Sequence, residues 1–220
     1  EAVLILEVSA NTIEEAEMIK VTYNTYITMK ICLANVVMEA SHKLDNVNCD
    51  NVMKGLFLGT ERLMSPKYLL GGMGDGGGCH PRDNIALSWL AKKLDMRYDW
   101  YENLMICREE QTEWLADLIV EYRDHELVTI LGKCFKKETN LTVGSPSILL
   151  KNLLEERGEQ VDMYDPWVDD YDIELDKRCY FIGTNHDKFL DYKFPEGSIV
   201  LDPWGMIEDQ EGVNVIRIGR

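Results

Sequence analysis

Leu127-Val-Thr-Ile-Leu-Gly132 is the stretch at which the hydrophobic pattern changes from a helical period to that of buried strands. A short apolar run that ends in glycine is typical of a strand buried in a sheet. A helix is expected next, followed by further strand patterns; these segments cover residues 147–157, 161–166, 178–183, 198–202 and 213–218. Strands that alternate with helices predict a Rossmann-like parallel α/β sheet, so residues 125–220 are expected to form a C-terminal domain.

Residues 1–124 are expected to form an all-helical domain. From Thr12 to about Lys43, apolar side chains recur every three or four residues, and neither proline nor glycine interrupts the pattern. The predicted helix would be roughly 45 Å long at 1.5 Å per residue, which suits a spine between domains or subunits. Shorter helices are predicted on either side of a glycine-rich loop, over residues 50–58, 84–94 and 100–123.

Composition and charge exclude several classes of protein. The chain has 220 residues, of which 45% are hydrophobic and 28% charged, as in an ordinary globular protein. Its net charge of −16 disfavours binding to nucleic acid or to an anionic membrane surface, and no apolar run has the roughly 18 residues of a membrane span. Six scattered cysteines without a Cys-x-x-Cys pair, and no signal-peptide pattern, indicate reduced thiols and a cytoplasmic protein. No metal site is expected, because the acidic stretch over 165–176 is interpreted as a solvated loop.

The glycine-rich loop contains a formal G-x-G-x-x-G match at Gly72, Gly74 and Gly77. A dinucleotide fingerprint needs a strand directly before it, and helices are predicted on both sides of this loop. A dinucleotide site is therefore not expected here. The glycines are expected to let the backbone pass close to another group and to present amides to a ligand.

Cys79 ends this loop, just before a predicted helix that has Pro81 near its start. Backbone N–H groups at a helix N-terminus favour the thiolate form, so Cys79 is a candidate nucleophile, and Asp83 would share its face of the helix. A packed structural cysteine explains the spacing equally well. His80 is disfavoured as a base for Cys79, because neighbours in sequence rarely point at each other.

Two further sets of polar residues are candidates for a site. Lys20 and Asn24 are four residues apart on the long predicted helix and can face one cleft, although a solvated lysine explains the spacing better. Lys136 and Lys137 follow the first predicted strand, at the end of a parallel sheet where α/β proteins bind ligands. This position suits an anionic ligand, and a surface loop is the alternative.

Taken together, these segments resemble the UDP-glucose/GDP-mannose dehydrogenase family. Glu17-Met-Ile-Lys20-x-x-x-Asn24 is similar to the family motif E-x-x-K-x-x-x-N. Gly76-Gly-Gly-Cys79-His-Pro-Arg-Asp83 is similar to the family motif G-G-x-C-x-P-K-D. The looser matches resemble the family's UDP-binding domain and lie at Ile130–Thr139, Ser145-Pro146, Tyr164-Asp-Pro166 and Thr184–Asp187.

The resemblance implies an NAD-dependent nucleotide-sugar 6-dehydrogenase that oxidises a UDP-hexose to the UDP-hexuronate in two steps. Cys79 would form a thiohemiacetal and then a thioester, and Lys20 and Asn24 would stabilise the oxyanion. Asp83 would position or activate the hydrolytic water. The resemblance also implies a homodimer built on the long helix. The residues expected to bind the substrate are Arg62, Tyr68, Gly76, Gly77, Phe135 and Lys136.

Three departures from the family pattern favour an alternative. The family's N-terminal NAD domain, roughly 200 residues and one domain by size, has no counterpart in this sequence, so the chain alone is expected to be inactive. The family's D-x-R-x-S-P and D-G-R patterns lose their arginines at Val143 and Trp204. A non-catalytic nucleotide-sugar-binding or dimerisation module is therefore the alternative function. The sequence also leaves open an acetamido sugar or GDP-mannose as substrate.

Overall fold

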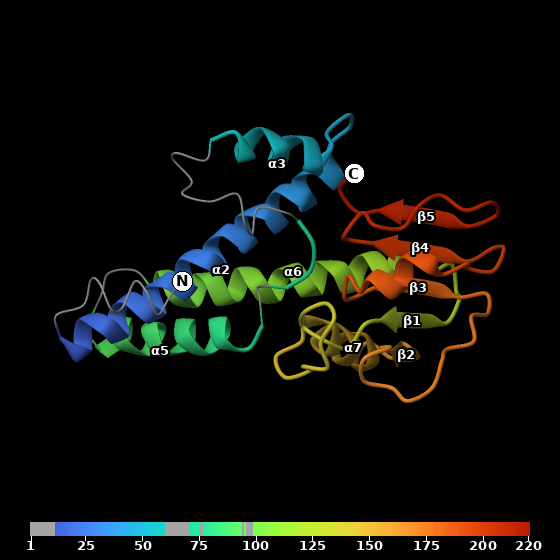
Figure 1. Cartoon of the computed structure of the whole chain (residues 1–220). Helices are drawn as coiled ribbons and strands as arrows, with labels where there is room; N and C mark the ends of the chain where they lie inside the picture. The colour runs from blue at the N-terminus through green and yellow to red at the C-terminus, as the bar shows by residue number, and fades with distance from the viewer. Residues whose placement is uncertain (1–11, 60–70, 75–76, 94, 96–98) are drawn as a thin grey trace.

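The computed structural model describes residues 12–59, 71–74, 77–93, 95 and 99–220. Within them, helices α2, α3, α5 and α6 are followed by a sheet with one α-helix and a 3-10 turn (Figure 1). This arrangement confirms the predicted fold class of a helical region followed by a parallel α/β domain. The bounds are α2 Ile13–Lys43, α3 Cys49–Phe57, α5 Cys79–Lys93, α6 Trp100–Tyr122, β1 Val128–Leu131, α7 Pro146–Glu156, β2 Val161–Tyr164, β3 Cys179–Ile182, η1 Asp187–Asp191, β4 Ile199–Asp202 and β5 Asn214–Arg217.

Helix α2 connects the two halves of the described structure. It begins with a capping box, in which the Thr12 hydroxyl accepts from the Glu15 amide and the Glu15 carboxylate accepts from the Thr12 amide, both at 3.2 Å. It packs against α3, α5 and α6, and its last turns reach the C-terminal end of the chain (Figure 1). There the backbone of Gly219 lies against Met38 of α2, so that a Cβ at Gly219 would be 2.7 Å from the Met38 carbonyl oxygen, and the Cys49 amide of α3 donates to the Gly219 carbonyl at 2.8 Å. The long helix therefore joins the helical region to the sheet.

The sheet is entirely parallel, with strand order β2-β1-β3-β4-β5. Val128 of β1 pairs with Val161 on one side and with Cys179 on the other. The chain therefore runs outward from β1 to β2 and then returns to build the rest of the sheet on the other side of β1. The carboxyl ends of β1 and β3 flank this switch point, where open α/β sheets bind ligands.

The two faces of the sheet carry separate hydrophobic clusters, because successive side chains of a strand point in opposite directions. Ile130 and Phe181 pack toward α6 and α7, in a cluster that includes Leu115 and Leu150. The opposite face carries a second cluster, formed by Leu131, Tyr164, Tyr180, Ile182, Phe189, Phe194, Val200 and Ile207. All four strands β1 to β4 contribute buried side chains, as the apolar sequence runs predicted.

Helix α5 begins earlier in the sequence than predicted. Residues 84–94 are predicted to be helical, whereas α5 already begins at Cys79. Proline in the first turn of a helix removes only an N–H group that has no intrahelical partner, so Pro81 does not delay the start. Cys79 is thus the first residue of the helix. Among the described residues, no helix combines the length and apolar character needed to cross a membrane.

The glycine-rich loop packs directly against the α/β domain. Gly77 has a φ of +99°, and a Cβ there would lie 2.6 Å from the Phe135 ring. Gly74 has a φ of +79°, and a Cβ there would lie 2.5 Å from Pro146. The predicted close approach of this backbone to another group is therefore correct for these two glycines, and the group approached is the protein's own second domain.

We expect Gly77→Ala to lower the free energy of unfolding by about 2–4 kcal/mol, because it combines left-handed backbone strain with a steric overlap at Phe135. Gly55→Ala is the matched control, because Gly55 is helical and a Cβ there meets nothing within 4 Å. The control is expected to raise stability by roughly 0.5–1 kcal/mol. Chemical denaturation measures both variants. Equal stabilities would show that the loop does not press on Phe135.

Candidate functional site

Three of the predicted site residues meet between α2 and α5. Lys20 and Asn24 project from α2, and the Lys20 Nζ and Asn24 Nδ2 atoms both donate to the same carboxylate oxygen of Asp83 on α5. The 4-residue spacing on α2 puts both donors on one face, as predicted. The Asp83 side chain is 7% exposed, whereas that of Lys20 is 39% exposed. The cluster is therefore closed at the carboxylate and open at the amine.

The Asp83 carboxylate is held in its ionised form. Burial alone would raise the pKa of Asp83, but the hydrogen bonds from Lys20 and Asn24 and the lysine charge outweigh burial and lower it. Arg82 adds a longer contact, with its Nε 3.3 Å from the other carboxylate oxygen. Lys20 and Asn24 each keep further N–H donors beyond the one used here. Those donors are available to an anionic group in front of the cluster.

Cys79 lies exposed at the N-terminus of α5, one turn before Asp83. On a helix, positions four apart place their Cβ atoms about 6 Å from each other. Asn84 fixes this turn, because its Nδ2 donates to the His80 carbonyl at 2.9 Å and approaches the Thr28 hydroxyl at 3.4 Å. An exposed cysteine therefore lies at a hydrogen-bonded helix start, one turn from the Lys20–Asp83–Asn24 cluster.

The other predicted site residues that the structure describes lie in the glycine-rich loop and in the loop after β1. Gly77 is buried beneath Phe135, and Lys136 is exposed in the same loop after β1. The Phe135 ring thus lies near the start of α5, where Cys79 is, because Gly77 is two residues before Cys79. Arg62, Tyr68 and Gly76 lie outside the described residues.

A cavity of about 380 Å³ opens at the carboxyl edge of the sheet. Trp204 forms one wall, and its ring lies against the backbone of Gly72 while its Nε1 donates to the Ile182 carbonyl at 2.9 Å. Arg220 also reaches this cavity, but its Nε is paired with the Asp50 carboxylate at 2.7 Å. The lining residues are Asp50, Lys54, Phe57, Gly71, Lys137, Asn185, Asp187, Leu190, Trp204, Met206 and Arg220.

Two family models match the chain and together cover most of it. Residues 14–107 match the central domain of the UDP-glucose/GDP-mannose dehydrogenase family, and residues 129–209 match the UDP binding domain of the same family. The chain belongs to this family. Residues 108–128 lie between the two matches.

Relatives in the dehydrogenase family share modest identity with the chain. UDP-glucose 6-dehydrogenase TuaD of Bacillus subtilis is 24% identical, over 92% of this chain and 44% of the relative. GDP-mannose 6-dehydrogenase of Pseudomonas putida is 32% identical, over 86% of this chain and 41% of the relative. The chain thus spans less than half the length of these two relatives. A solved structure of a UDP-glucose dehydrogenase from Pyrobaculum islandicum shares the fold, with a TM-score of 0.79, 22% identity, and coverage of 92% of this chain and 50% of that one.

One interpretation of this dehydrogenase-family sequence needs correction. The acidic stretch over 165–176 is predicted to be solvated, and Asp170, Asp172, Glu174 and Asp176 are exposed, but Asp165 is fully buried. Its carboxylate accepts from the Lys133 amide at 2.6 Å and the Cys134 amide at 3.0 Å, and it also contacts His186. The local pattern carries no signal for this role, because these partners lie 21 to 32 residues away in the sequence.

The low pKa of Asp83 predicts a pH-dependent contribution to stability. A carboxyl group whose pKa is lowered in the folded state contributes stability above its unfolded pKa of about 3.9, and this is lost as the pH falls through the folded pKa. The difference in unfolding free energy between the wild type and Asp83→Asn should therefore be largest above about pH 5 and shrink toward pH 2.5.

Urea denaturation from pH 6 to about pH 2.5 measures this difference. Glu121→Gln, which changes an exposed carboxylate on α6, is the control and should show a small difference at every pH. A difference that stays constant for Asp83→Asn would contradict the inferred ionised state of Asp83.

Proposed function

We propose that the protein containing this chain is an NAD-dependent nucleotide-sugar 6-dehydrogenase that converts a UDP-hexose to the UDP-hexuronate. The observation that carries the proposal is the exposed thiol of Cys79, one helical turn from a buried carboxylate that holds Lys20 and Asn24. Membership of the dehydrogenase family supports the same reaction class. A thiol next to cationic and amide donors suits attack on a carbonyl carbon and stabilisation of the resulting oxyanion.

The glycine-rich loop does not fit a dinucleotide cofactor. In the glycine-rich loop, the space in front of Gly74 and Gly77 is filled by Pro146 and Phe135, so these glycines do not cradle a pyrophosphate. Oxidation of a primary alcohol to a carboxylate removes four electrons, which two NAD⁺ molecules would accept as two hydrides. NAD⁺ would have to bind elsewhere in the full-length protein.

Cys79 would carry the covalent steps. Attack of its sulfur on the C6 aldehyde forms a carbon–sulfur bond and turns the carbonyl into a thiohemiacetal hydroxyl. Removal of a hydride from that carbon leaves a thioester. Addition of water then breaks the carbon–sulfur bond, which releases the carboxylate and returns the thiol. The exposed position at the start of α5 gives the sulfur the access to substrate that these steps need.

Lys20, Asn24 and Asp83 would act together on the oxyanion and on water. The N–H donors that Lys20 and Asn24 do not use on Asp83 are free to stabilise negative charge on the C6 oxygen. The lowered pKa makes Asp83 a weak proton acceptor, so we assign it to orienting the two donors and the hydrolytic water. Asp83 would therefore position the hydrolytic water and would not activate it by taking a proton.

The nucleotide would bind at the carboxyl edge of the sheet. Phe135 and Lys136 lie in the loop after β1, and the Phe135 ring lies against Gly77, so a nucleotide sugar bound along this loop would have its sugar end toward Cys79. Lys136 supplies positive charge for the diphosphate, and the cavity beside Trp204 offers an apolar wall. Val143 and Trp204 stand where the family pattern has arginines, which favours a substrate or nucleotide that differs from UDP-glucose.

Activity measurements on the full-length protein test the proposal. We expect NADH formation with at least one sugar from a panel of UDP-glucose, UDP-N-acetylhexosamines and GDP-mannose. Cys79→Ser should lower kcat by at least about a thousandfold, and Lys20→Met by about a hundredfold or more, because each removes a group used in the transition state. Cys107→Ser, which changes a half-buried cysteine on α6, is the control and should keep wild-type kcat.

The alternative, a nucleotide-sugar-binding module without catalysis, gives a different result. UDP would bind, as calorimetry would show, but no nucleotide sugar in the panel would be oxidised, and Cys79→Ser would bind UDP as tightly as the wild type. The lost arginines at Val143 and Trp204 favour this outcome. Full turnover by Cys79→Ser would instead refute the covalent mechanism.

We also propose that the protein is a homodimer formed through α2. Three large apolar side chains on this helix are strongly exposed: Ile13 is 75% exposed, Met18 47% and Leu33 49%. A shallow apolar hollow runs along the same helix, lined by Met18, Ile19, Thr22, Tyr23 and Tyr26. A second copy of the chain would cover these side chains, and apolar burial is the main driving force for such association.

Sedimentation velocity measures the mass of the assembly. We expect the wild type to have twice the mass of one chain, and Met18→Glu to shift it toward the monomer, because a buried charge opposes association. Leu127→Glu is the matched control, because Leu127 is also 47% exposed but lies outside α2. A monomeric wild type, or dimers in both variants, would rule out this interface.

A further inference from the structure

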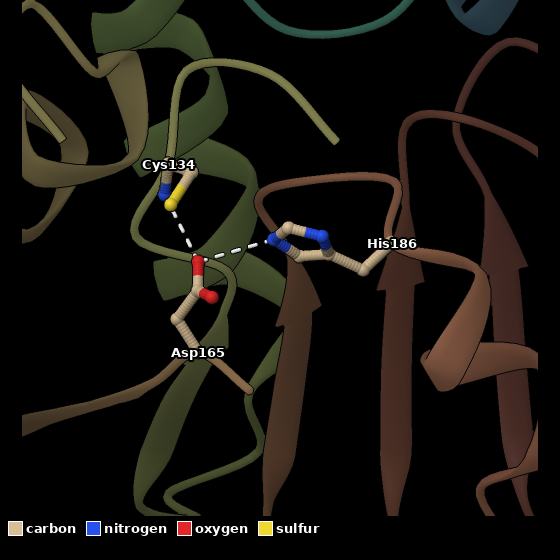
Figure 2. A group of neighbouring side chains, drawn as sticks. All are labelled: Cys134, Asp165 and His186. Carbon is tan, nitrogen blue, oxygen red and sulfur yellow. Dashed lines mark hydrogen bonds and ion pairs between the residues drawn. The ribbon is translucent and has the colours of Figure 1, made fainter. Parts of the chain in front are cut away.

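A buried cluster of three polar side chains lies at the switch point of the sheet. Cys134, Asp165 and His186 follow the carboxyl ends of β1, β2 and β3, and all three are buried (Figure 2). Their Sγ, carboxylate oxygen and ring nitrogen lie within 4.8 Å of one another. The proposed reaction uses none of them. The same three atom types are also those that bind zinc in proteins, so the cluster has two possible roles.

The hydrogen bonds of His186 decide against a metal. The Glu138 amide donates to His186 Nδ1 at 3.0 Å, so Nδ1 carries a lone pair and no proton. The neutral ring then has its proton on Nε2, which lies 3.1 Å from the Asp165 carboxylate and donates to it. If a metal took the Nε2 position, the ring proton would have to move to Nδ1, where it would face the Glu138 N–H donor. The ring is therefore assigned as a hydrogen-bond bridge from the Glu138 backbone to Asp165.

Cys134 and Asp165 complete the bridge. Burial and the neighbouring carboxylate raise the pKa of Cys134 to about 12, so its thiol stays protonated and can donate to Asp165 (Figure 2). Burial by itself would raise the pKa of Asp165, but the bonds from His186 and from the Trp167 and Lys133 amides hold it well below its usual range. A carboxylate with this many donors is ionised and fully partnered.

The cluster holds both ends of one loop. Asp165 accepts the amides of Lys133 at 2.6 Å and Cys134 at 3.0 Å, and His186 accepts the amide of Glu138 at 3.0 Å. The residues between these anchors include Phe135, whose ring lies against Gly77, and Lys136. Gly77 is two residues before Cys79. The anchors therefore set where this loop stands relative to the proposed nucleophile.

We propose that Asp165 and His186 are positioning residues for nucleotide-sugar binding. They hold the loop over 133–138 from two sides, so that Phe135 and Lys136 are presented to the diphosphate and sugar next to Cys79. Neither residue touches the substrate, and both act through backbone amides of the loop. This proposal rests on the proposed function, because the loop is useful only if a nucleotide sugar binds there.

Two substitutions of His186 separate the two bonds of its ring. The Gln side chain can place an N–H group near the position of Nε2, so His186→Gln keeps the donor to Asp165 and loses the acceptor for the Glu138 amide. The Asn side chain can place its oxygen near Nδ1, so His186→Asn keeps that acceptor and loses the bond to Asp165. Lys188→Ala, two residues away on η1 with an exposed ion pair to Asp172, is the matched control.

Steady-state kinetics of the full-length protein give the first readout. His186→Gln should raise KM for the nucleotide sugar about tenfold while kcat stays within about twofold, because the Glu138 amide loses its partner and the loop is freed at that end. His186→Asn should raise KM by less than about threefold, and Lys188→Ala should match the wild type. Equal KM values for His186→Gln and the wild type would overturn the proposal.

Hydrogen exchange gives a second readout that needs no substrate. Amide exchange in the segment 133–138 should be faster in His186→Gln than in His186→Asn or the wild type. Faster exchange together with an unchanged KM refutes positioning but leaves the dehydrogenase intact. A wild type that binds neither UDP nor GDP refutes the dehydrogenase itself, and the positioning role with it. Stoichiometric zinc in the wild type that is lost in His186→Gln would overturn the proposal in favour of a metal site.

Discussion

The close packing of the glycine-rich loop against the carboxyl edge of the parallel sheet is the constraint on which the proposed site depends. Phe135 and Pro146 occupy the space where side chains at Gly77 and Gly74 would project. Gly74 and Gly77 have left-handed backbone conformations and no Cβ atom, and this allows the close approach. Because α5 begins two residues after Gly77, the contact fixes the start of that helix, and Cys79 with it, beside the carboxyl edge of the sheet.

Two buried carboxylates, Asp83 and Asp165, hold the elements of this arrangement together. The negative charge of each is balanced by a different set of hydrogen-bond donors. Asp83 is held by side-chain donors from another helix, so it joins α5 to α2. Asp165 is held mainly by backbone amides and His186, so it joins three loops at the end of the sheet. A buried charge is tolerated only when it is fully partnered, so both networks resist rearrangement.

The periodic parts of the fold were predictable from the sequence. The long helix, the four strands after Gly132 and helix α7 lie within two residues of their predicted bounds, because apolar spacing reports directly which face of an element is buried. Lys20, Asn24 and Asp83 were also found by spacing and motif, and the structure brings them into contact. The start of α5 was placed five residues too late, at residue 84 instead of Cys79.

The sequence by itself therefore determined the element order, the parallel sheet, the family and the polar residues at helical spacing. Only the tertiary structure decided that Asp165 is buried rather than solvated, that His186 bridges it to Glu138, and that the glycines face Phe135 and Pro146 instead of a pyrophosphate. Local pattern encodes contacts between residues a few positions apart. These partners are 21 to 72 positions apart, and chain folding alone brings them together.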